Sequence, residues 1–281
     1  MDGHDPSILL RGDRVDFEIS FAKAEDKAKL KALFLNSFDD TIGFVNMFFD
    51  HNFNPENIVC VKMGEEIIGE AHLLPCTIDG ADCFYAYGIC VDKKHRKEGV
   101  GLALMEFIKA HAERKGYGVL LHPADEHLFS FYEKAGFYPC GYHCEKTICA
   151  EDEAVPLLPV TAEKYKAVRN RAFRDVTPLL WDEKAVEYAL LQEAFFGLEA
   201  FSAECDGREE ILLCGKDSGG AFIKETTAKK DALQKIVSAV AKRYGTECVR
   251  VILPREASSN ALVCGYGFNV PKDIYMNLLL D

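Results

Sequence analysis

A short loop at residues 96–101 combines an arginine with two glycines, a combination that suits a phosphate-binding turn. Arg96, Gly99 and Gly101 follow a strand-like run, Tyr85 to Val91, and open an amphipathic stretch. The first N–H groups of a helix have no intrahelical partner and attract anions, and glycine lets the chain approach an anion without a Cβ in the way. The loop therefore predicts a nucleotide-like phosphate at the helix start, although a tight turn before an amphipathic helix has the same pattern.

The loop matches neither of two familiar nucleotide-binding patterns. The G-x-G-x-x-G spacing of dinucleotide sites and the G-x-x-x-x-G-K-[ST] spacing of phosphate loops are both absent. Four cations lie in or beside it in a chain whose formal net charge is −12: Lys93, Lys94, Arg96 and Lys97. Such a cluster can be a solvated turn, but an anionic cofactor at the loop would use its charge.

The elements around the loop form a βαβ-type unit. The helix that follows the glycines closes at Lys115 and Gly116, a cation in the last turn and a glycine cap. A second strand, Gly118 to His122, leads to a short helix, Leu128 to Lys134, which Gly136 ends. The first helix has an apolar face at the 3.6-residue period, made of Val100, Leu104, Phe107, Ile108 and the ring of His111.

Two segments of this unit resemble the GNAT N-acetyltransferases. Val91 to Ala103 is similar to their coenzyme A pyrophosphate loop, an Arg or Gln, two residues, Gly, one residue, and Gly or Ala. Phe131-Tyr132, followed by Gly136-Phe137, resembles the last helix of the same superfamily. Phe48 to Asn57 and Ala71 to Pro75 look like the Eis-like branch. The resemblance covers residues 15 to 150 and implies an α/β fold (α+β, mixed sheet), a mostly antiparallel sheet flanked by helices.

The resemblance implies acetyl-CoA as the cofactor and assigns residues to it. The strand backbone would hydrogen-bond the thioester, and the glycine loop would hold the diphosphate. Asp125 stands where the superfamily often has Asn, seven residues before the tyrosine. The implied cofactor-binding residues are Ile89, Cys90, Val91, Arg96, Lys97, Glu98, Gly99, Val100, Gly101, Leu102, Ala103, Asp125 and Phe131.

The resemblance makes Tyr132 the general acid that protonates the departing thiolate. A tyrosine of unperturbed pKa about 10 stays protonated beside a thiol whose pKa is about 8.5. A core tyrosine with a satisfied hydroxyl is the structural alternative. The candidate bases are Glu70, His72 and His122, each of which could relay a proton through water. Larger Eis-type enzymes use a terminal carboxylate after a third, sterol-carrier-like domain, a role we do not carry over to Asp281.

The amine acceptor is suggested only by charge and by the resemblance. A net charge of −12 fits a cationic substrate, although solubility alone also explains an acidic surface. The same charge argues against nucleic acid or an anionic membrane as a main partner. In Eis-like proteins the second helix forms one wall of the acceptor cleft, so we assign substrate contacts to Phe44, Phe48, Tyr85 and Tyr87.

The segment before the loop reads as a strand, two helices and an antiparallel meander. We expect strands at 16–22, 58–63 and 66–75, helices at 24–36 and 39–51, and turns at Gly64-Glu65 and Asp79-Gly80. Two prolines and an acidic run mark a boundary near 150–159. The predicted domains are a flexible leader at 1–14, a catalytic GNAT domain at 15–150, a linker at 151–159 and a second domain at 160–281.

The second half looks like a degenerate copy of the first. Pro254 to Phe268 aligns on Pro123 to Phe137 without a gap, and Ile236 to Gly245 aligns on Phe107 to Gly116. Val263 stands at the position of Tyr132, and residues 225–229 replace the glycine loop without a glycine. We therefore expect tandem GNAT-like domains, of which the second binds no coenzyme and shapes the acceptor cleft.

The cysteines predict neither disulfides nor a metal site. There are eleven, an odd number, and no signal-peptide pattern precedes them. Most lie in apolar strand-like runs, as Cys60, Cys90, Cys214 and Cys248 do, where a reduced cysteine acts as a small hydrophobe. The remaining cluster matches no strong zinc pattern: Cys140, His143, Cys144 and Cys149.

Two functions fit these observations. The first is an acetyl-CoA-dependent N-acetyltransferase that acts on a primary amine of a small molecule or peptide by direct attack in a ternary complex. The second is a non-catalytic acyl-CoA-binding module that kept the fold. Intact Gly99, Gly101 and Tyr132 favour the first. No apolar run is long enough to cross a bilayer, so we expect a cytoplasmic protein, and a homo-oligomer is compatible with the sequence.

Overall fold

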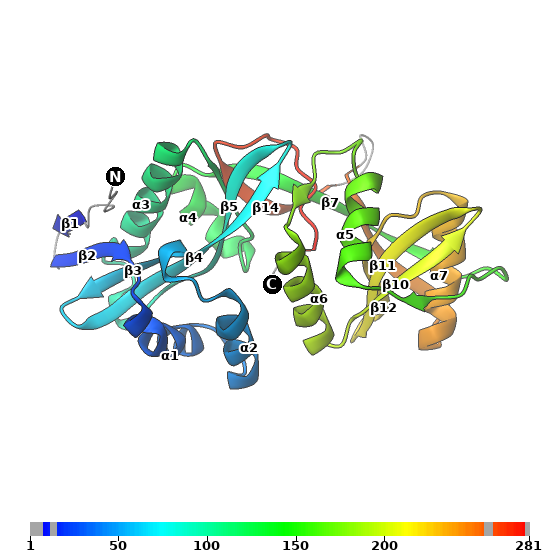
Figure 1. Cartoon of the computed structure of the whole chain (residues 1–281), viewed down its shortest axis with the longest axis horizontal. Helices are drawn as coiled ribbons and strands as arrows, with labels where there is room; N and C mark the ends of the chain where they lie inside the picture. The colour runs from blue at the N-terminus through cyan, green and yellow to red at the C-terminus, as the bar shows by residue number, and fades with distance from the viewer. Residues whose placement is uncertain (1–7, 12–15, 256–260, 279–281) are drawn as a thin grey trace. The chain divides into compact units, whose positions relative to one another are not determined.

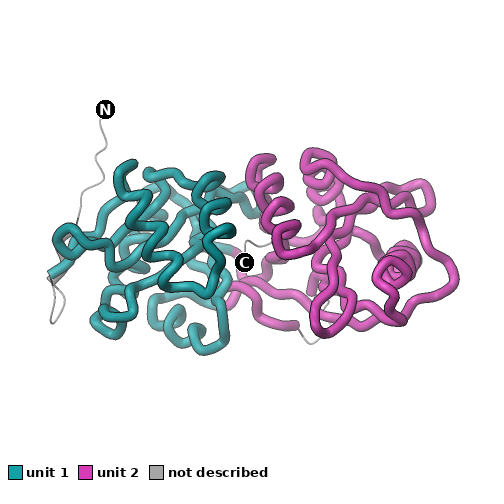
Figure 2. Tube along the Cα trace, turned by 90° about the horizontal axis from the view of Figure 1, so that it is seen from below, with its two compact units in different colours: residues 1–138, 266–270 teal, residues 139–265, 271–281 magenta. Residues whose placement is uncertain are grey.

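The computed structural model describes residues 8–11, 16–255 and 261–278, arranged in two compact units. Unit 1 comprises residues 1–138 and 266–270, and unit 2 comprises residues 139–265 and 271–281. Figure 2 shows unit 1 in teal and unit 2 in magenta. Unit 1 therefore includes a short segment from near the end of the chain, and unit 2 includes residues 139–150, which the sequence analysis assigned to the first domain.

Unit 1 is a sheet covered by helices on both faces. The strand order is β1-β2-β3-β4-β5-β6 and then the last residues of β14, with every pairing antiparallel except β5 with β6. Figure 1 shows α3 on one face and α1 and α2 on the other. The bounds are β1 Ile8–Arg11, β2 Asp16–Phe21, α1 Lys27–Ser37, α2 Ile42–Asn52, β3 Ile58–Met63, β4 Glu66–Ile78, β5 Ala81–Val91, α3 Val100–Lys115, β6 Gly118–Leu121, α4 Phe129–Lys134 and β14 Leu262–Phe268.

The predicted fold class is confirmed, and the predicted elements lie where the patterns put them. Gly99 and Gly116 flank α3 with left-handed φ values of +87° and +71°, so the cap signals read from the sequence are correct. The turns at residues 64–65 and 79–80 join β3 to β4 and β4 to β5. Part of the segment expected to be a flexible leader, residues 1–14, is instead a strand, because Ile8–Arg11 pairs with β2. Residues 1–7 and 12–15 of that leader lie outside the described residues.

Unit 2 repeats the element order of unit 1. Both units contain two helices, three antiparallel strands, a helix, and a strand that pairs in parallel with the third. The sheet order in unit 2 is β7-β13-β12-β11-β10-β8. The bounds are β7 Tyr138–Cys149, β8 Leu158–Pro159, α5 Ala162–Ala172, β9 Leu179–Leu180, α6 Glu183–Phe195, β10 Glu199–Cys205, β11 Arg208–Asp217, β12 Gly220–Thr226, α7 Asp231–Tyr244 and β13 Cys248–Pro254.

The last strand of each half is exchanged. Residues Tyr266–Phe268 of β14 pair antiparallel with β6 in unit 1, and β7 beyond Tyr138 pairs antiparallel with β13 in unit 2. The predicted domain boundaries at residues 150 and 159 divide the chain into consecutive segments and do not include this exchange. Because the two strands are equivalent in the repeat, their patterns suit either sheet, and sequence alone does not say which one each joins.

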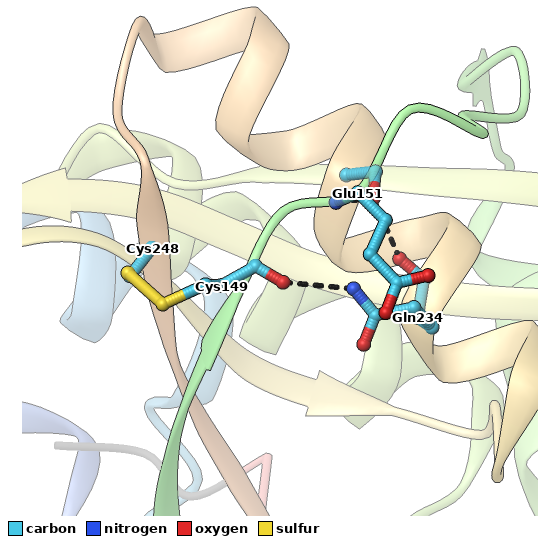
Figure 3. The surroundings of a disulfide bond; sticks show 5 residues. Cys149, Glu151, Gln234 and Cys248 are labelled. Carbon is cyan, nitrogen blue, oxygen red and sulfur yellow. Dashed lines mark hydrogen bonds between the residues drawn. A yellow bond between two sulfur atoms is a disulfide. The ribbon is translucent and has the colours of Figure 1, made fainter.

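A disulfide corrects the expectation for Cys248. Cys149 and Cys248 face each other across β7 and β13 and are disulfide-bonded (Figure 3). The Cys149 carbonyl also accepts a hydrogen bond of 2.8 Å from Gln234 Nε2 of α7. The prediction was wrong because it treated each cysteine by its local run, whereas the bond depends on the pairing of β7 with β13. The nine other cysteines, including Cys140 and Cys144, are buried and are not disulfide-bonded.

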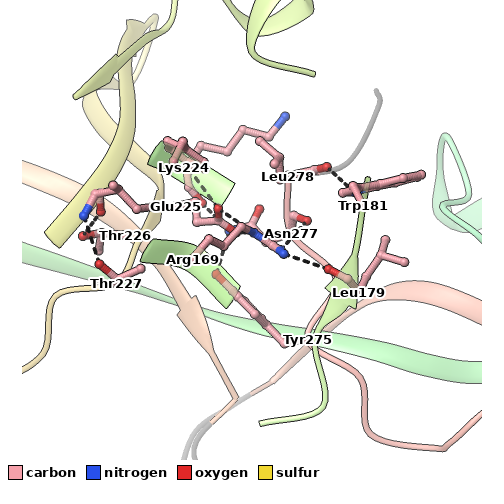
Figure 4. A network of polar contacts seen from close by, with 12 residues as sticks. Arg169, Leu179, Trp181, Lys224, Glu225, Thr226, Thr227, Tyr275, Asn277 and Leu278 are labelled. Carbon is pink, nitrogen blue, oxygen red and sulfur yellow. Dashed lines mark hydrogen bonds and ion pairs between the residues drawn. The ribbon is translucent and has the colours of Figure 1, made fainter. Parts of the chain in front are cut away.

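A buried polar network inside unit 2 joins α5 and β12 to the last described residues. The Arg169 Nε donates to both carboxylate oxygens of Glu225 at 3.0 and 3.1 Å, and its other nitrogens donate to the carbonyls of Leu179 and Asn277 (Figure 4). Tyr165 donates to the same carboxylate at 2.9 Å. Glu225 lies where the sequence repeat replaces the glycine loop. In unit 2 this position therefore holds a fully buried ion pair.

We expect Arg169→Met to lower the free energy of unfolding by about 3–5 kcal/mol, because it leaves the Glu225 carboxylate buried without its cation. Arg250→Met is the matched control. Arg250 pairs with Glu145 and Asp217 at the surface, where an ion pair contributes below about 1 kcal/mol. Urea denaturation of both variants measures the difference, and equal losses would contradict a structural role for the buried network.

Among the helices that the structure describes, none combines the length and apolarity needed to cross a membrane. Within the same residues, no group of three His, Cys, Asp or Glu side chains is placed to hold a metal ion.

Candidate active site

The candidate site begins where β5 leaves β6. The parallel pairing joins Cys83, Phe84 and Tyr85 to β6 and does not extend to residues 86–91. Opposite β4, the register shifts between Glu70 and His72, so β5 carries a bulge. Within the described chain, the β6-facing edge of β5 therefore has no strand partner after Tyr85. Its backbone groups are available to a ligand that lies along Ile89 to Val91.

Gly88 makes this bulge possible, and sequence reasoning missed it. Its φ is +61°, and a Cβ there would lie 2.6 Å from Cε2 of Phe34. Both the backbone conformation and the close approach of the ring require glycine. A glycine inside a strand pattern is a known sign of a bulge, so the signal was present in the sequence.

We expect Gly88→Ala to lower the free energy of unfolding by about 2–4 kcal/mol. This is the sum of the cost of a non-glycine residue in the left-handed conformation and the cost of overpacking against the Phe34 ring. Gly80→Ala is the matched control. Gly80 has φ +78° with nothing within 4 Å of its Cβ position, so it isolates the conformational cost of about 1–2 kcal/mol. Chemical denaturation compares the two, and equal losses would show that the Phe34 contact carries no energy.

The glycine loop is braced by its own side chains. Asp92 Oδ1 accepts a hydrogen bond from the Lys94 N–H at 2.8 Å, and the Arg96 Nε donates to the Val91 carbonyl at 3.2 Å. His95 Nδ1 lies 3.1 Å from a carboxylate oxygen of Glu98. Arg96 and Glu98, both assigned to the cofactor, thus hold the loop in shape. The other three cations, Lys93, Lys94 and Lys97, lie in the segment that precedes α3.

The start of α3 combines an open position with a closely packed one. A Cβ on Gly99 would meet nothing within 4 Å, whereas a Cβ on Gly101 would lie 3.3 Å from Cζ of Phe131 and 3.8 Å from Cγ2 of Val91. The structure thus brings Val91, Gly101 and Phe131 together. The open N–H groups around Gly99, on a helix that begins at Val100, suit an anion.

Tyr132 lies on α4 beside this cluster and is held neutral. It is 5% exposed, and burial, aided by the negative charge of Asp125, raises the pKa of Tyr132 to about 12. Its ring lies 5.1 Å from the ring of Phe131 and 6.3 Å from that of Tyr266. Its hydroxyl hydrogen-bonds to none of the residues that the structure describes. The phenol therefore keeps its proton, and its hydroxyl is not committed to a hydrogen bond with any residue in the described ranges.

Asp125 serves the backbone in this structure. It is exposed, and its Oδ1 accepts a hydrogen bond of 2.7 Å from the His127 N–H, which caps the short 3-10 turn Glu126–Leu128. An asparagine oxygen would accept the same bond, so the Asp is compatible with the turn that precedes α4.

Glu70 and His72, two of the candidate bases, lie inside the core instead of at the loop. Their side chains are 0% and 1% exposed and approach to 3.4 Å. Burial raises the pKa of Glu70 well above its ordinary value and lowers the pKa of His72 to about 3. The rings of Phe48 and Phe49 lie 4.9 and 5.2 Å from the His72 ring. Both groups are therefore neutral, and neither reaches solvent.

The remaining predicted residues separate by exposure. His122, the third candidate base, is exposed directly after β6. Of the predicted acceptor contacts, Phe44, Phe48 and Tyr85 are at most 1% exposed and belong to the core. Tyr87 alone is half-buried, with its ring 4.9 Å from that of Phe48. The structure brings together three of the residues assigned to the cofactor, Val91, Gly101 and Phe131, but it buries most of the residues assigned to the acceptor.

Comparison with known proteins finds a family model that matches part of the chain. Residues 54–139 match the model of the acetyltransferase (GNAT) domain. This segment contains β5, the glycine loop, α3 and Tyr132, and therefore the whole cofactor assignment. Among curated proteins, no sequence matches the chain.

Solved structures share the fold at low sequence identity. A GCN5-related N-acetyltransferase from Anabaena variabilis is 16% identical with a TM-score of 0.67, covering 89% of this chain and 72% of that one. A probable N-acyltransferase from Enterococcus faecalis is 13% identical with a TM-score of 0.69 and the same coverage. Eis1 from Mycobacterium abscessus is 12% identical with a TM-score of 0.66, again covering 89% and 72%. At these identities the likeness concerns the fold.

Proposed function

We propose that the protein transfers an acetyl group from acetyl-CoA to a primary amine in a ternary complex, because residues 54–139 match the model of the acetyltransferase (GNAT) domain. The observation that carries the proposal is the packing of Phe131 near Gly101 and Val91, which connects three features of the chain. These are the unpaired edge of β5, the open helix start at Gly99, and the neutral phenol of Tyr132.

The residues present fit acetyl-CoA. The open N–H groups at Gly99 and the basic loop suit a diphosphate, and Gly101 keeps Val91 and Phe131 close together at the helix start. When bound, the cofactor supplies an activated acetyl thioester. Backbone groups along Ile89 to Val91 would bind and polarise its carbonyl, and Tyr132 would hold a proton for the departing sulfur.

His122 is the best candidate among the three bases. It is exposed directly after β6, so its ring is in contact with solvent. Glu70 and His72 are buried as a neutral pair and have no such contact. In this proposal the pair supports the β4–β5 bulge, and His122 takes the amine proton through water.

The proposed acceptor is a cationic amine, and unit 2 is a degenerate GNAT-like copy that binds no coenzyme. The net charge of −12 supports a cationic substrate. The repeated element order supports a tandem origin, and the glycine-free loop at residues 225–229 argues against a second coenzyme. The likeness to Eis1 in fold supports an Eis-like arrangement of the chain.

Thiol release from acetyl-CoA tests the proposal directly. The purified protein is incubated with acetyl-CoA and a panel of polyamines, aminoglycosides and peptides, and free thiol is measured with and without amine. We expect amine-dependent release with at least one cationic acceptor. Binding of acetyl-CoA without release for any amine would instead support the non-catalytic acyl-CoA-binding module.

A further inference from the structure

A cavity lies in unit 2, beside the start of α7. Its volume is about 520 Å³, which is within the size range of small-molecule sites. Strands β12 and β13 pair only at Phe222–Ile223 with Arg250–Val251, and the cavity is bounded by the residues that follow on each strand. By the repeat, this is the counterpart of the place where β5 leaves β6 in unit 1.

The wall of this cavity is apolar and belongs to the core of unit 2. Phe173 is 2% exposed and Leu253 is 8% exposed. Leu253 and Ala228 are members of the buried cluster, and Leu233 packs against it from α7. An alkyl chain bound here would be removed from water and buried against these apolar side chains, and that burial favours binding.

The charged residues of the cavity all have one sign. Four cations line it, namely Lys146, Lys229, Lys230 and Arg255, and among the described residues no acidic side chain does. This is unusual in a chain with 45 acidic and 33 basic residues. A neighbouring hollow of about 890 Å³ shares Lys229 and Lys230 but also carries carboxylates, so only the smaller cavity selects for charge.

We propose that this cavity binds a small amphiphilic anion, a carboxylate or phosphate head on an alkyl tail. The cations recognise the head, and the apolar wall holds the tail. The loop that lines the cavity has no glycine at residues 225–229, and its hydroxyls are already used. Thr226 Oγ1 donates to the Ile211 carbonyl at 3.0 Å, and Thr227 Oγ1 donates to Glu210. The site therefore differs from the coenzyme site of unit 1 and does not depend on acetyl transfer.

Calorimetric titration with octanoate, octyl phosphate and octanol tests the head and the tail separately. We expect one molecule of each anion to bind per chain and octanol to bind at least about tenfold more weakly, a difference of about 1.4 kcal/mol. The comparison of the two anions distinguishes a carboxylate ligand from a phosphate ligand. Octanol binding as tightly as both anions would overturn the charge selection.

Two variants locate the binding. Lys229→Glu combined with Lys230→Glu should weaken octanoate binding at least about tenfold, because it reverses two cations at the cavity. The control, Lys184→Glu with Lys242→Glu, changes the net charge equally at exposed positions of the same unit that do not line the cavity. Ala172→Trp should abolish binding by filling the cavity, while far-ultraviolet circular dichroism shows that it folds. Unchanged octanoate affinity in both the charge-reversed and the filled variant, or no anion binding by the parent protein, would overturn the proposal.

Discussion

Tyr132→Phe is expected to lower the rate of amine-dependent thiol release by about 10²-fold, the low end of the contribution of a general acid. The substitution removes one oxygen atom and leaves the ring against Phe131 and Tyr266. Because the hydroxyl has no hydrogen-bond partner among the described residues, stability should not change. The measurements are kcat, the acetyl-CoA dissociation constant and Tm, of which only kcat should move.

The pH profile separates a general acid from a merely structural tyrosine. With the pKa of Tyr132 raised to about 12 by burial, the parent enzyme keeps this proton throughout the assay range. The Tyr132→Phe variant has no phenol proton to donate. Its loss of kcat relative to the parent should become smaller above about pH 8.5, where the released thiol is stable as a thiolate. Tyr117→Phe, in the loop after α3, is the matched control. A deficit that stays constant with pH would contradict the assignment.

Local patterns were sufficient to predict the elements around the loop. Gly99 and Gly116 bound α3 because a left-handed cap and an amphipathic period are both encoded within a few residues. Tyr132, Gly101 and Phe131 were predicted to act together, and α4 does bring Phe131 over Gly101. Each of these features depends on short-range spacing, which a single sequence contains in full.

Features that depend on pairing between distant strands could not be predicted in the same way. The Cys149–Cys248 bond and the exchange of β7 and β14 both require knowing which strand lies beside which. Phe44 and Phe48 show the same limit for the site, because an aromatic face on a helix suits a cleft wall and a core equally. In the structure both rings are buried in the core, and the Phe48 ring lies 4.9 Å from the ring of His72 on β4.

Gly101→Trp is expected to weaken acetyl-CoA binding by about 10²-fold, because the cofactor assignment depends on the packing at this residue. A Cβ at this position would lie 3.3 Å from Phe131 and 3.8 Å from Val91, so an indole must displace the ring or project toward the position that we propose for the diphosphate. Isothermal titration with acetyl-CoA and with free CoA measures the loss, and circular dichroism checks the fold.

Glu113→Trp supplies the matched control, since it places the same side chain on an exposed position in the last turn of α3. Its affinity for acetyl-CoA should stay within about twofold of the parent, because surface substitutions away from a site change free energies by roughly 0.5 kcal/mol or less. Equal affinity in the two variants would mean that the diphosphate does not bind where α3 begins. The thioester could then not lie along β5 beside Tyr132, so the same result would also remove the structural basis for the proposed acetyl transfer.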